Sequence, residues 1–144
     1  MASKKKTLLF DLDGIVTDLT GEILRRINAI YGTEYKNSDI NVWEFHKKGS
    51  PVFHKEEHRL MAEEIFIRPE LTRNLPFIDG SVDALKRLQS TQKYEMAFVS
   101  APYDSNPTWV YDRTLWFKET KINKIVPHLI FTHSKSMVDR RYSY

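Results

Sequence analysis

Two aspartates separated by one residue, Asp11 and Asp13, directly follow the apolar run at residues 7–10. Residues i and i+2 of an extended segment point to the same side, so both carboxylates can face one small volume. Two like charges held that close are unfavourable unless a cation lies between them or one carboxyl keeps its proton. A divalent metal and a phosphate-bearing substrate would supply that compensation. The spacing therefore predicts phosphate chemistry at the end of this strand.

The two aspartates belong to a longer pattern, LLFDLDGIVTD, which runs from Leu8 to Asp18. A lone D-x-D is common in surface turns, whereas the apolar strand followed by D-x-D-G, an apolar residue and a further aspartate is much more specific. This pattern resembles the first motif of the haloacid-dehalogenase-like (HAD) phosphatases. The resemblance implies that Asp11 is the nucleophile and Asp13 the general acid/base. A carboxylate can attack phosphorus and so divide one difficult hydrolysis into two easier steps.

Composition narrows the class of protein. The 144 residues suit one domain, and a hydrophobic fraction of 41% with 28% charged residues is typical of globular proteins. The net charge of +3 is modest, and the short basic tail at residues 4–6 is better explained as a solvated terminus than as a nucleic-acid arm. The absence of cysteine excludes thiol chemistry, and neither a signal peptide nor an apolar run near the ~18 residues of a membrane span occurs. We therefore expect a cytoplasmic protein that binds neither membranes nor nucleic acid.

Strand and helix patterns alternate along the chain. Strands are expected at residues 7–10, 94–99 and 128–132, and helices at 23–31, 54–66, 81–88 and 106–116. The alternation predicts an α/β fold whose parallel sheet is covered by helices on both faces. The two helices before Gly80 interrupt it, which predicts a helical cap above the carboxyl end of the first strand. We expect a core at residues 1–16 and 77–144 and a cap at 17–76.

Aromatic residues in the expected cap could stack on a nucleobase. Core packing is the favoured interpretation for each one alone, but we expect at least one to line a base pocket. In the second cap helix, Leu60, Met61 and Ile65 are expected to share one apolar face. The cap aromatics are Trp43, Phe45, Phe53 and Phe66, of which Trp43, Phe45 and Phe66 are the candidate substrate contacts.

Two further motifs stand at strand ends. In FVSAP, the Ser100 hydroxyl and the backbone around Ala101 can hydrogen-bond a phosphate oxygen. Ser100 matches the second HAD motif. In FTHSKS, Lys135 lies where the HAD resemblance implies a lysine that neutralises the charge of the nucleophile and the phosphoryl group.

A closer resemblance extends over nearly the whole chain. DLDGIVTD, NVWEF, LPFIDGSVDALKRL, VSAP, YDRTLWF and IFTHSKS follow in the order seen in 5'(3')-deoxyribonucleotidases. The resemblance implies Mg²⁺-dependent hydrolysis of (deoxy)nucleoside monophosphates, with Asp11 and Asp13 as metal ligands. Arg113, in YDRTLWF, falls where related sequences often carry a basic residue. It is interpreted either as a phosphate contact or as a solvated helix residue.

The chain departs from this family at one motif. An acidic pair that completes the Mg²⁺ site should follow the lysine, but Asp139 is the only carboxylate after Lys135. Asp11, the backbone carbonyl of Asp13, water and phosphate would then supply the oxygen ligands. Residues 142–144 are expected to begin the strand that flanks the first one. Three explanations stay open: a truncated enzyme, a protein that binds nucleotides without turnover, or a sheet completed by a partner chain, for example in a homodimer.

Other functions are less well supported. Residues 54–58 match H-x-x-E-H, a zinc-protease pattern, but no third ligand is evident and an exposed charged helix face explains them better. A receiver domain would place its phosphorylated aspartate on a later strand and would lack the helical insertion. Neither G-x-x-x-x-G-K-[ST] nor G-x-G-x-x-G occurs. The main alternative is a nucleotide-binding or regulatory protein without turnover.

Overall fold

A four-stranded parallel sheet forms the centre of the computed structural model, which describes residues 5–138 and 142–143. Its strands are β1 (Lys6–Asp11), β2 (Tyr94–Ser100), β3 (His128–Phe131) and β4 (Tyr142–Ser143), in the spatial order β3-β2-β1-β4. Asp11 is paired with Val99, and Ser100 with Phe131. The carboxyl ends of β1, β2 and β3 therefore meet at one edge of the sheet, and the α/β fold expected from the sequence is confirmed.

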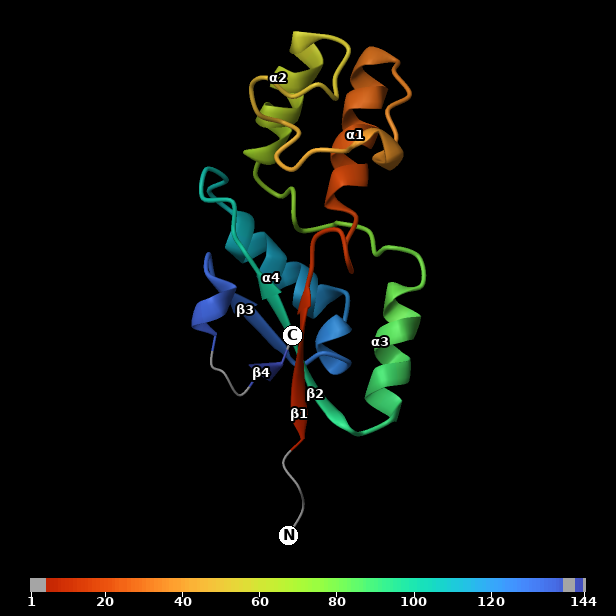
Figure 1. Ribbon diagram of the computed structural model, residues 1–144, viewed down its shortest axis with the longest axis vertical. Helices are drawn as coiled ribbons and strands as arrows, with labels where there is room; N and C mark the ends of the chain where they lie inside the picture. The colour runs from red at the N-terminus through yellow and green to blue at the C-terminus, as the bar shows by residue number, and fades with distance from the viewer. Residues whose placement is uncertain (1–4, 139–141, 144) are drawn as a thin grey trace.

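Helices α3 (Ser81–Ser90) and α4 (Trp109–Glu119) pack on one face of this sheet (Figure 1). Their buried side chains form an apolar cluster with Met96 and Phe98 of β2. The opposite face carries a smaller cluster to which no described α-helix contributes, made of Leu9, Ala97 and Val99 with Ile130 and Val138. The expectation of helices on both faces is thus wrong for the described residues. The physical reason is that β1-α3-β2 and β2-α4-β3 advance in the same direction, and right-handed crossovers then place both helices on the same face.

The short strand β4 lies beside β1. Tyr142 pairs with Thr7 and Ser143 with Leu8, both in parallel register. The prediction that the strand flanking β1 begins at Tyr142 is confirmed for these two residues. Tyr144 and Asp139 lie outside the described part of the chain.

Between β1 and α3, the chain forms a helical insert above the sheet (Figure 1). Helices α1 (Leu19–Tyr31) and α2 (Glu56–Phe66), with the 3₁₀ turn η1 (Asn37–Asp39), enclose their own apolar cluster, which includes Ile23, Ile27 and Ile65. The expected shared face of α2 is only partly correct. Met61 and Ile65 pack into the cluster, but Leu60 is 51% exposed. The buried side of α2 is completed by two polar residues, His58 and Arg59, which the apolar pattern does not reveal.

The segment with the zinc-protease pattern is a structural part of this insert. The Nδ1 atom of His58 lies 2.8 Å from the Tyr35 hydroxyl, and the same hydroxyl accepts a hydrogen bond from the His54 backbone N–H at 2.8 Å. His58 is buried, so the expectation of an exposed charged face is wrong at this position. Within the described residues, no group of three His, Cys, Asp or Glu side chains could hold a metal ion. His54, in the loop before α2, and His58, in α2, thus both bind the hydroxyl of Tyr35 and have a structural role.

Two linkers join the insert to the sheet, and they pair with each other. The Asp18 N–H donates to the Pro76 carbonyl at 2.9 Å, and the Ile78 N–H donates to the Val16 carbonyl at 2.8 Å. The return linker, residues 67–80, and the end of α2 are also bonded to the segment just before α4. Asn106 Nδ2 donates to the Phe66 and Arg68 carbonyls at 2.9 and 2.8 Å. The insert is therefore tied to the sheet from two sides.

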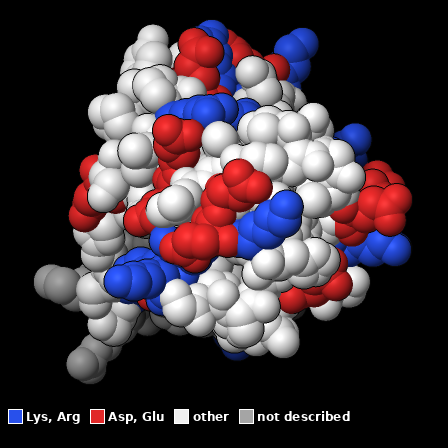
Figure 2. All heavy atoms as spheres, turned by 90° about the horizontal axis from the view of Figure 1, so that it is seen from above, with Lys and Arg blue, Asp and Glu red and all other residues white. Residues whose placement is uncertain are grey.

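Basic and acidic side chains are interspersed on the end of the molecule that Figure 2 shows from above. Ion pairs within α1 and α2, such as Arg26–Glu22 and Arg59–Glu63, contribute to this mixture. None of the helices in the described ranges combines the length and the hydropathy that crossing a membrane would require.

Candidate active site

The turn after β1 places the two motif aspartates. Gly14 has a φ of +83°, a left-handed conformation that favours glycine. Its N–H donates to the Thr17 carbonyl at 2.9 Å, and the Leu12 carbonyl accepts from the Val16 and Thr17 N–H groups at 2.8 and 2.9 Å. The chain thus folds back at once after Asp13, which keeps this carboxylate at the carboxyl end of β1.

Asp11 and Lys135 form an ion pair across this edge. The Lys135 Nζ atom lies 3.0 Å from Asp11 Oδ2, while Asp11 Oδ1 accepts a hydrogen bond from the Leu12 N–H at 2.9 Å. Lys135 begins the 3₁₀ turn η3 (Lys135–Met137), which follows β3. The two side chains are 41% and 38% exposed, respectively, so a ligand can reach both. Residues far apart in the sequence are brought together here in the way that the motif order predicts.

Asp13 is held by two donors on one oxygen. Its Oδ1 atom accepts from the Thr17 hydroxyl at 3.0 Å and from Arg113 Nη2 at 2.5 Å. Arg113 is 0% exposed, and its guanidinium carbon lies 5.3 Å from the centre of the Trp116 ring. The interpretation of Arg113 as a solvated helix residue is therefore wrong, because α4 turns this side chain toward the sheet. Thr17 was not among the sequence candidates, although its place in GIVTD, four residues after Asp13, is the signal that points to it.

Ser100 ends β2 beside Asp11. Its backbone carbonyl accepts from the Thr132 N–H at 3.0 Å, which links it to the segment after β3. Its hydroxyl is buried and makes no hydrogen bond within the described residues. A buried polar group without a partner is unfavourable, which fits a hydroxyl that completes its bonding with a ligand. Ala101 follows Ser100 and is exposed at the start of the next loop. In that loop, Asp104 Oδ1 lies 3.0 Å from Nε2 of His133, a residue of the loop after β3.

Of the three aromatic candidates, two are buried and one is exposed. Phe45 and Phe66 are buried in the core of the insert with their ring centres 5.8 Å apart, as core packing predicts. Phe66 also packs on Tyr103, a residue of the loop after β2. Trp43 is 91% exposed, so its ring is available for contact with another molecule.

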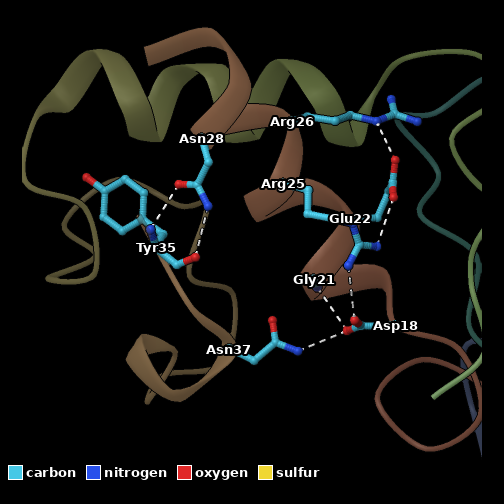
Figure 3. Close-up of polar contacts among 8 residues, drawn as sticks. All are labelled: Asp18, Gly21, Glu22, Arg25, Arg26, Asn28, Tyr35 and Asn37. Carbon is cyan, nitrogen blue, oxygen red and sulfur yellow. Dashed lines mark hydrogen bonds and ion pairs between the residues drawn. The ribbon is translucent and has the colours of Figure 1, made fainter. Parts of the chain in front are cut away.

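The segment at residues 37–46, which carries Trp43, makes a polar contact with another part of the chain at each end. Figure 3 shows Asp18, whose Oδ1 atom accepts from the Gly21 N–H and from Asn37 Nδ2, each at 3.0 Å. At the other end, His46 Nε2 lies 3.5 Å from the Tyr103 hydroxyl. Burial lowers the pKa of His46, which favours the neutral ring in this contact. One end of the segment thus contacts the start of α1, which closely follows Asp13, and the other end contacts the loop that follows Ser100.

The oxygens at the end of β1 suit a hard divalent cation. Mg²⁺ commonly binds proteins through one or two carboxylates and keeps several waters. The partly exposed carboxylate of Asp11 and the nearby backbone carbonyl of Asp13 are ligands of this kind. The donor set of the described residues therefore fits Mg²⁺ completed by water and phosphate, and it lacks a third side-chain carboxylate.

The chain is similar to one known protein family in sequence and to several solved structures in the course of its backbone. The sequence model of a family described as "5' nucleotidase, deoxy (Pyrimidine), cytosolic type C protein" matches residues 5–141. The comparison with curated proteins gave no match. Solved structures with a similar course of the chain include a hydrolase of Streptococcus pneumoniae, with 17% identity and a TM-score of 0.49 over 96% of this chain and 71% of that one. Another is the HAD hydrolase YfnB of Bacillus subtilis, in a form bound to magnesium, with 15% identity and a TM-score of 0.49 over 90% of this chain. The matched part is 64% of the B. subtilis chain.

Proposed function

Because this chain belongs to the family of deoxy (pyrimidine), cytosolic type C 5' nucleotidases, we propose that it is a phosphomonoester hydrolase of (deoxy)nucleoside monophosphates. The observation that carries the proposal is the contact of Asp11 with Lys135 beside Asp13, at the edge where β1 and β2 end. It joins a nucleophile, a cation and a second carboxylate in one accessible place. These are the groups that a phosphoryl transfer through an aspartyl phosphate needs.

In the proposed mechanism, the substrate phosphate lies between Asp11, Ser100 and Lys135. An oxygen of Asp11 attacks phosphorus, the bond from phosphorus to the ribose oxygen breaks, and Asp13 gives its proton to the departing oxygen. Asp13 then takes a proton from water as that water attacks the aspartyl phosphate, which releases phosphate and restores Asp11. Lys135, the Ser100 hydroxyl and the backbone at Ala101 balance the charge on the phosphoryl oxygens. Mg²⁺, when held by Asp11 and the Asp13 carbonyl, would supply additional neutralisation of that charge.

We expect Mg²⁺-dependent phosphate release from nucleoside monophosphates. The measurement is phosphate release from matched deoxy- and ribonucleotides, with Mg²⁺ and with EDTA, where EDTA is expected to lower the rate at least about 100-fold because the phosphoryl charge is then less neutralised. Deoxypyrimidine nucleotides are expected to be the better substrates, in line with the family description. Calorimetric binding of the same nucleotides without any release would contradict the proposal and favour the nucleotide-binding alternative.

The helical insert, residues 17–76, is proposed to act as a cap that contacts the base through Trp43. The ring is exposed and lies in the segment that links Asp18 to Tyr103. Stacking of a base on an aromatic ring contributes about 1–3 kcal/mol, so Trp43→Ala should raise KM for a deoxypyrimidine monophosphate about 5- to 150-fold.

The effect should depend on the base. With deoxyribose 5-phosphate, which has no base, KM should stay the same in Trp43→Ala and in wild type. Tyr111→Ala removes another exposed aromatic ring, on α4, and serves as the matched control. Equal KM values of wild type and Trp43→Ala for the nucleotide would exclude Trp43 from the base site.

The family description also specifies a cytosolic type. On this basis the cytosol is the proposed location, in agreement with the expectation from the sequence.

A further inference from the structure

The guanidinium of Arg113 is buried with only one of its nitrogens in a hydrogen bond. Nη2 donates to Asp13 Oδ1, whereas Nε and Nη1 are buried and have no partner among the described residues. Arg59, the other buried arginine of the part of the chain that the structure describes, is bonded through all three nitrogens, to Glu56, Glu63 and the His46 carbonyl. Arg113 therefore lacks the complete set of bonds that usually offsets the burial of this side chain.

Such a charge is unfavourable unless it is paired, and an apolar side chain of similar volume would often be at least as stable in its place. Besides the contact with the Trp116 ring, the hydrogen bond to Asp13 is thus the feature that distinguishes Arg113 from an apolar residue at this position. With the Thr17 hydroxyl, it places two donors on Oδ1 of Asp13. Within the described residues, no hydrogen bond involves the other oxygen, Oδ2, and the side chain is 25% exposed. The carboxyl is therefore oriented with Oδ2 available to a ligand.

Helix α4 is itself well anchored, so it can hold Arg113 in place. The Trp116 ring lies against the guanidinium, and its Nε1 atom donates to the Leu75 carbonyl at 3.1 Å. On the other side of Arg113 in the sequence, Asp112 accepts a hydrogen bond from the Glu70 N–H at 2.8 Å. Both contacts bind α4 to the linker that returns from the insert. A small shift of this helix would move the Asp13 carboxylate.

We propose that Arg113 is a positioning residue, which orients Asp13 for proton transfer and does not bind the substrate phosphate. The inference rests on the proposed function. As the bond from phosphorus to the ribose oxygen breaks, Oδ2 of Asp13 delivers its proton to that oxygen, and in the second half-reaction Oδ2 receives a proton from the attacking water. Oδ1 stays bonded to Arg113 and Thr17 throughout.

The kinetic test separates leaving groups that need a proton from one that does not. With enzyme in excess, nucleoside release from a deoxypyrimidine monophosphate should slow about 10- to 100-fold in Arg113→Lys and more in Arg113→Met, because proton transfer is impaired. Release of nitrophenolate from 4-nitrophenyl phosphate should stay within about threefold of wild type, because this leaving group departs without a proton. Arg59→Lys, the same exchange at a buried arginine remote from Asp13, should leave both rates unchanged. Equal slowing of both substrates in Arg113→Lys would overturn the proposal.

Inorganic phosphate gives a second measurement, because it tests the interpretation of Arg113 as a phosphate contact. Its inhibition constant should be the same in wild type and Arg113→Lys. A tenfold weaker inhibition in the variant would assign Arg113 to phosphate binding and overturn the positioning role.

A structural measurement decides the point without any activity. Crystal structures should show the Asp13 carboxylate displaced from its wild-type orientation in Arg113→Lys and rotated further in Arg113→Met. An unchanged orientation in Arg113→Met would overturn the proposal. If Arg113→Met does not fold, the Lys variant decides, since a rotated Asp13 there with normal nucleoside release excludes a positioning role. Failure of the proposed function has a different signature, namely a wild-type protein that releases neither nucleoside nor nitrophenolate.

Discussion

Replacing Asp11 with asparagine is expected to lower phosphate release from nucleoside monophosphates by at least about 10⁴-fold, because the variant has no carboxylate to form the covalent intermediate. Asp11 lies at the carboxyl end of β1 with one oxygen facing Lys135, and the exchange keeps its size. Nucleotide binding should persist, since Ser100, Lys135 and the insert are unchanged. Phosphate release and calorimetric titration with the same nucleotide measure the two properties separately.

Asp104→Asn is the matched control for this exchange. Asp104 is an exposed carboxylate of the loop after β2, and its partner is His133 rather than a group on β1. Its loss should leave the rate within about twofold of wild type, as is usual for exposed sites outside the chemistry. If Asp11→Asn kept the wild-type rate, Asp11 could not be the nucleophile. If both variants lost activity equally, the loss would reflect general damage to this edge of the sheet.

The contacts at the edge of the sheet could be predicted because they follow from strand order. Asp11, Ser100 and Lys135 each stand at or just after the end of a strand that the apolar pattern identifies. In a parallel sheet such ends converge, so their neighbourhood needs no knowledge of side-chain packing. The apolar pattern also predicts the limits of the strands closely. Residues 7–10 are the expected first strand, and β1 spans Lys6–Asp11.

The buried polar groups could not be predicted in this way. Arg113 and Asp13 are 100 residues apart, and nothing in the local pattern of α4 shows that this arginine faces Asp13. The charged pattern around His58 predicts an exposed helix face, yet His58 is buried with Tyr35 as its partner. In both cases a distant side chain offsets the burial of a polar group. Hydrophobic periodicity records only the average preference of each residue type.

Trp116→Ala is expected to reduce the free energy of unfolding by about 3–5 kcal/mol, the usual range for deleting a buried aromatic side chain. Trp116 is completely buried and packs on Phe77 and Phe98, so it joins the return linker to the sheet. Its Nε1 atom also donates to the Leu75 carbonyl, which would lose this partner. Urea denaturation followed by circular dichroism, with the midpoint and the slope both fitted, gives the change in unfolding free energy.

Two other variants show whether a loss of unfolding free energy in Trp116→Ala comes from the burial of this ring. Trp116→Phe keeps most of the ring volume and removes the bond to Leu75, so a loss of about 1–2 kcal/mol is expected. Trp43→Ala deletes an exposed ring and should change stability by less than about 0.5 kcal/mol. Equal stability of Trp116→Ala and Trp43→Ala would contradict the packing of α4 on the sheet. The expected order, with Trp116→Ala far below the other two, would show that the helix carrying Arg113 is fixed by the same ring that covers its guanidinium. The position of Arg113, and through it the orientation of Asp13, would then depend in part on the packing that stabilises the core.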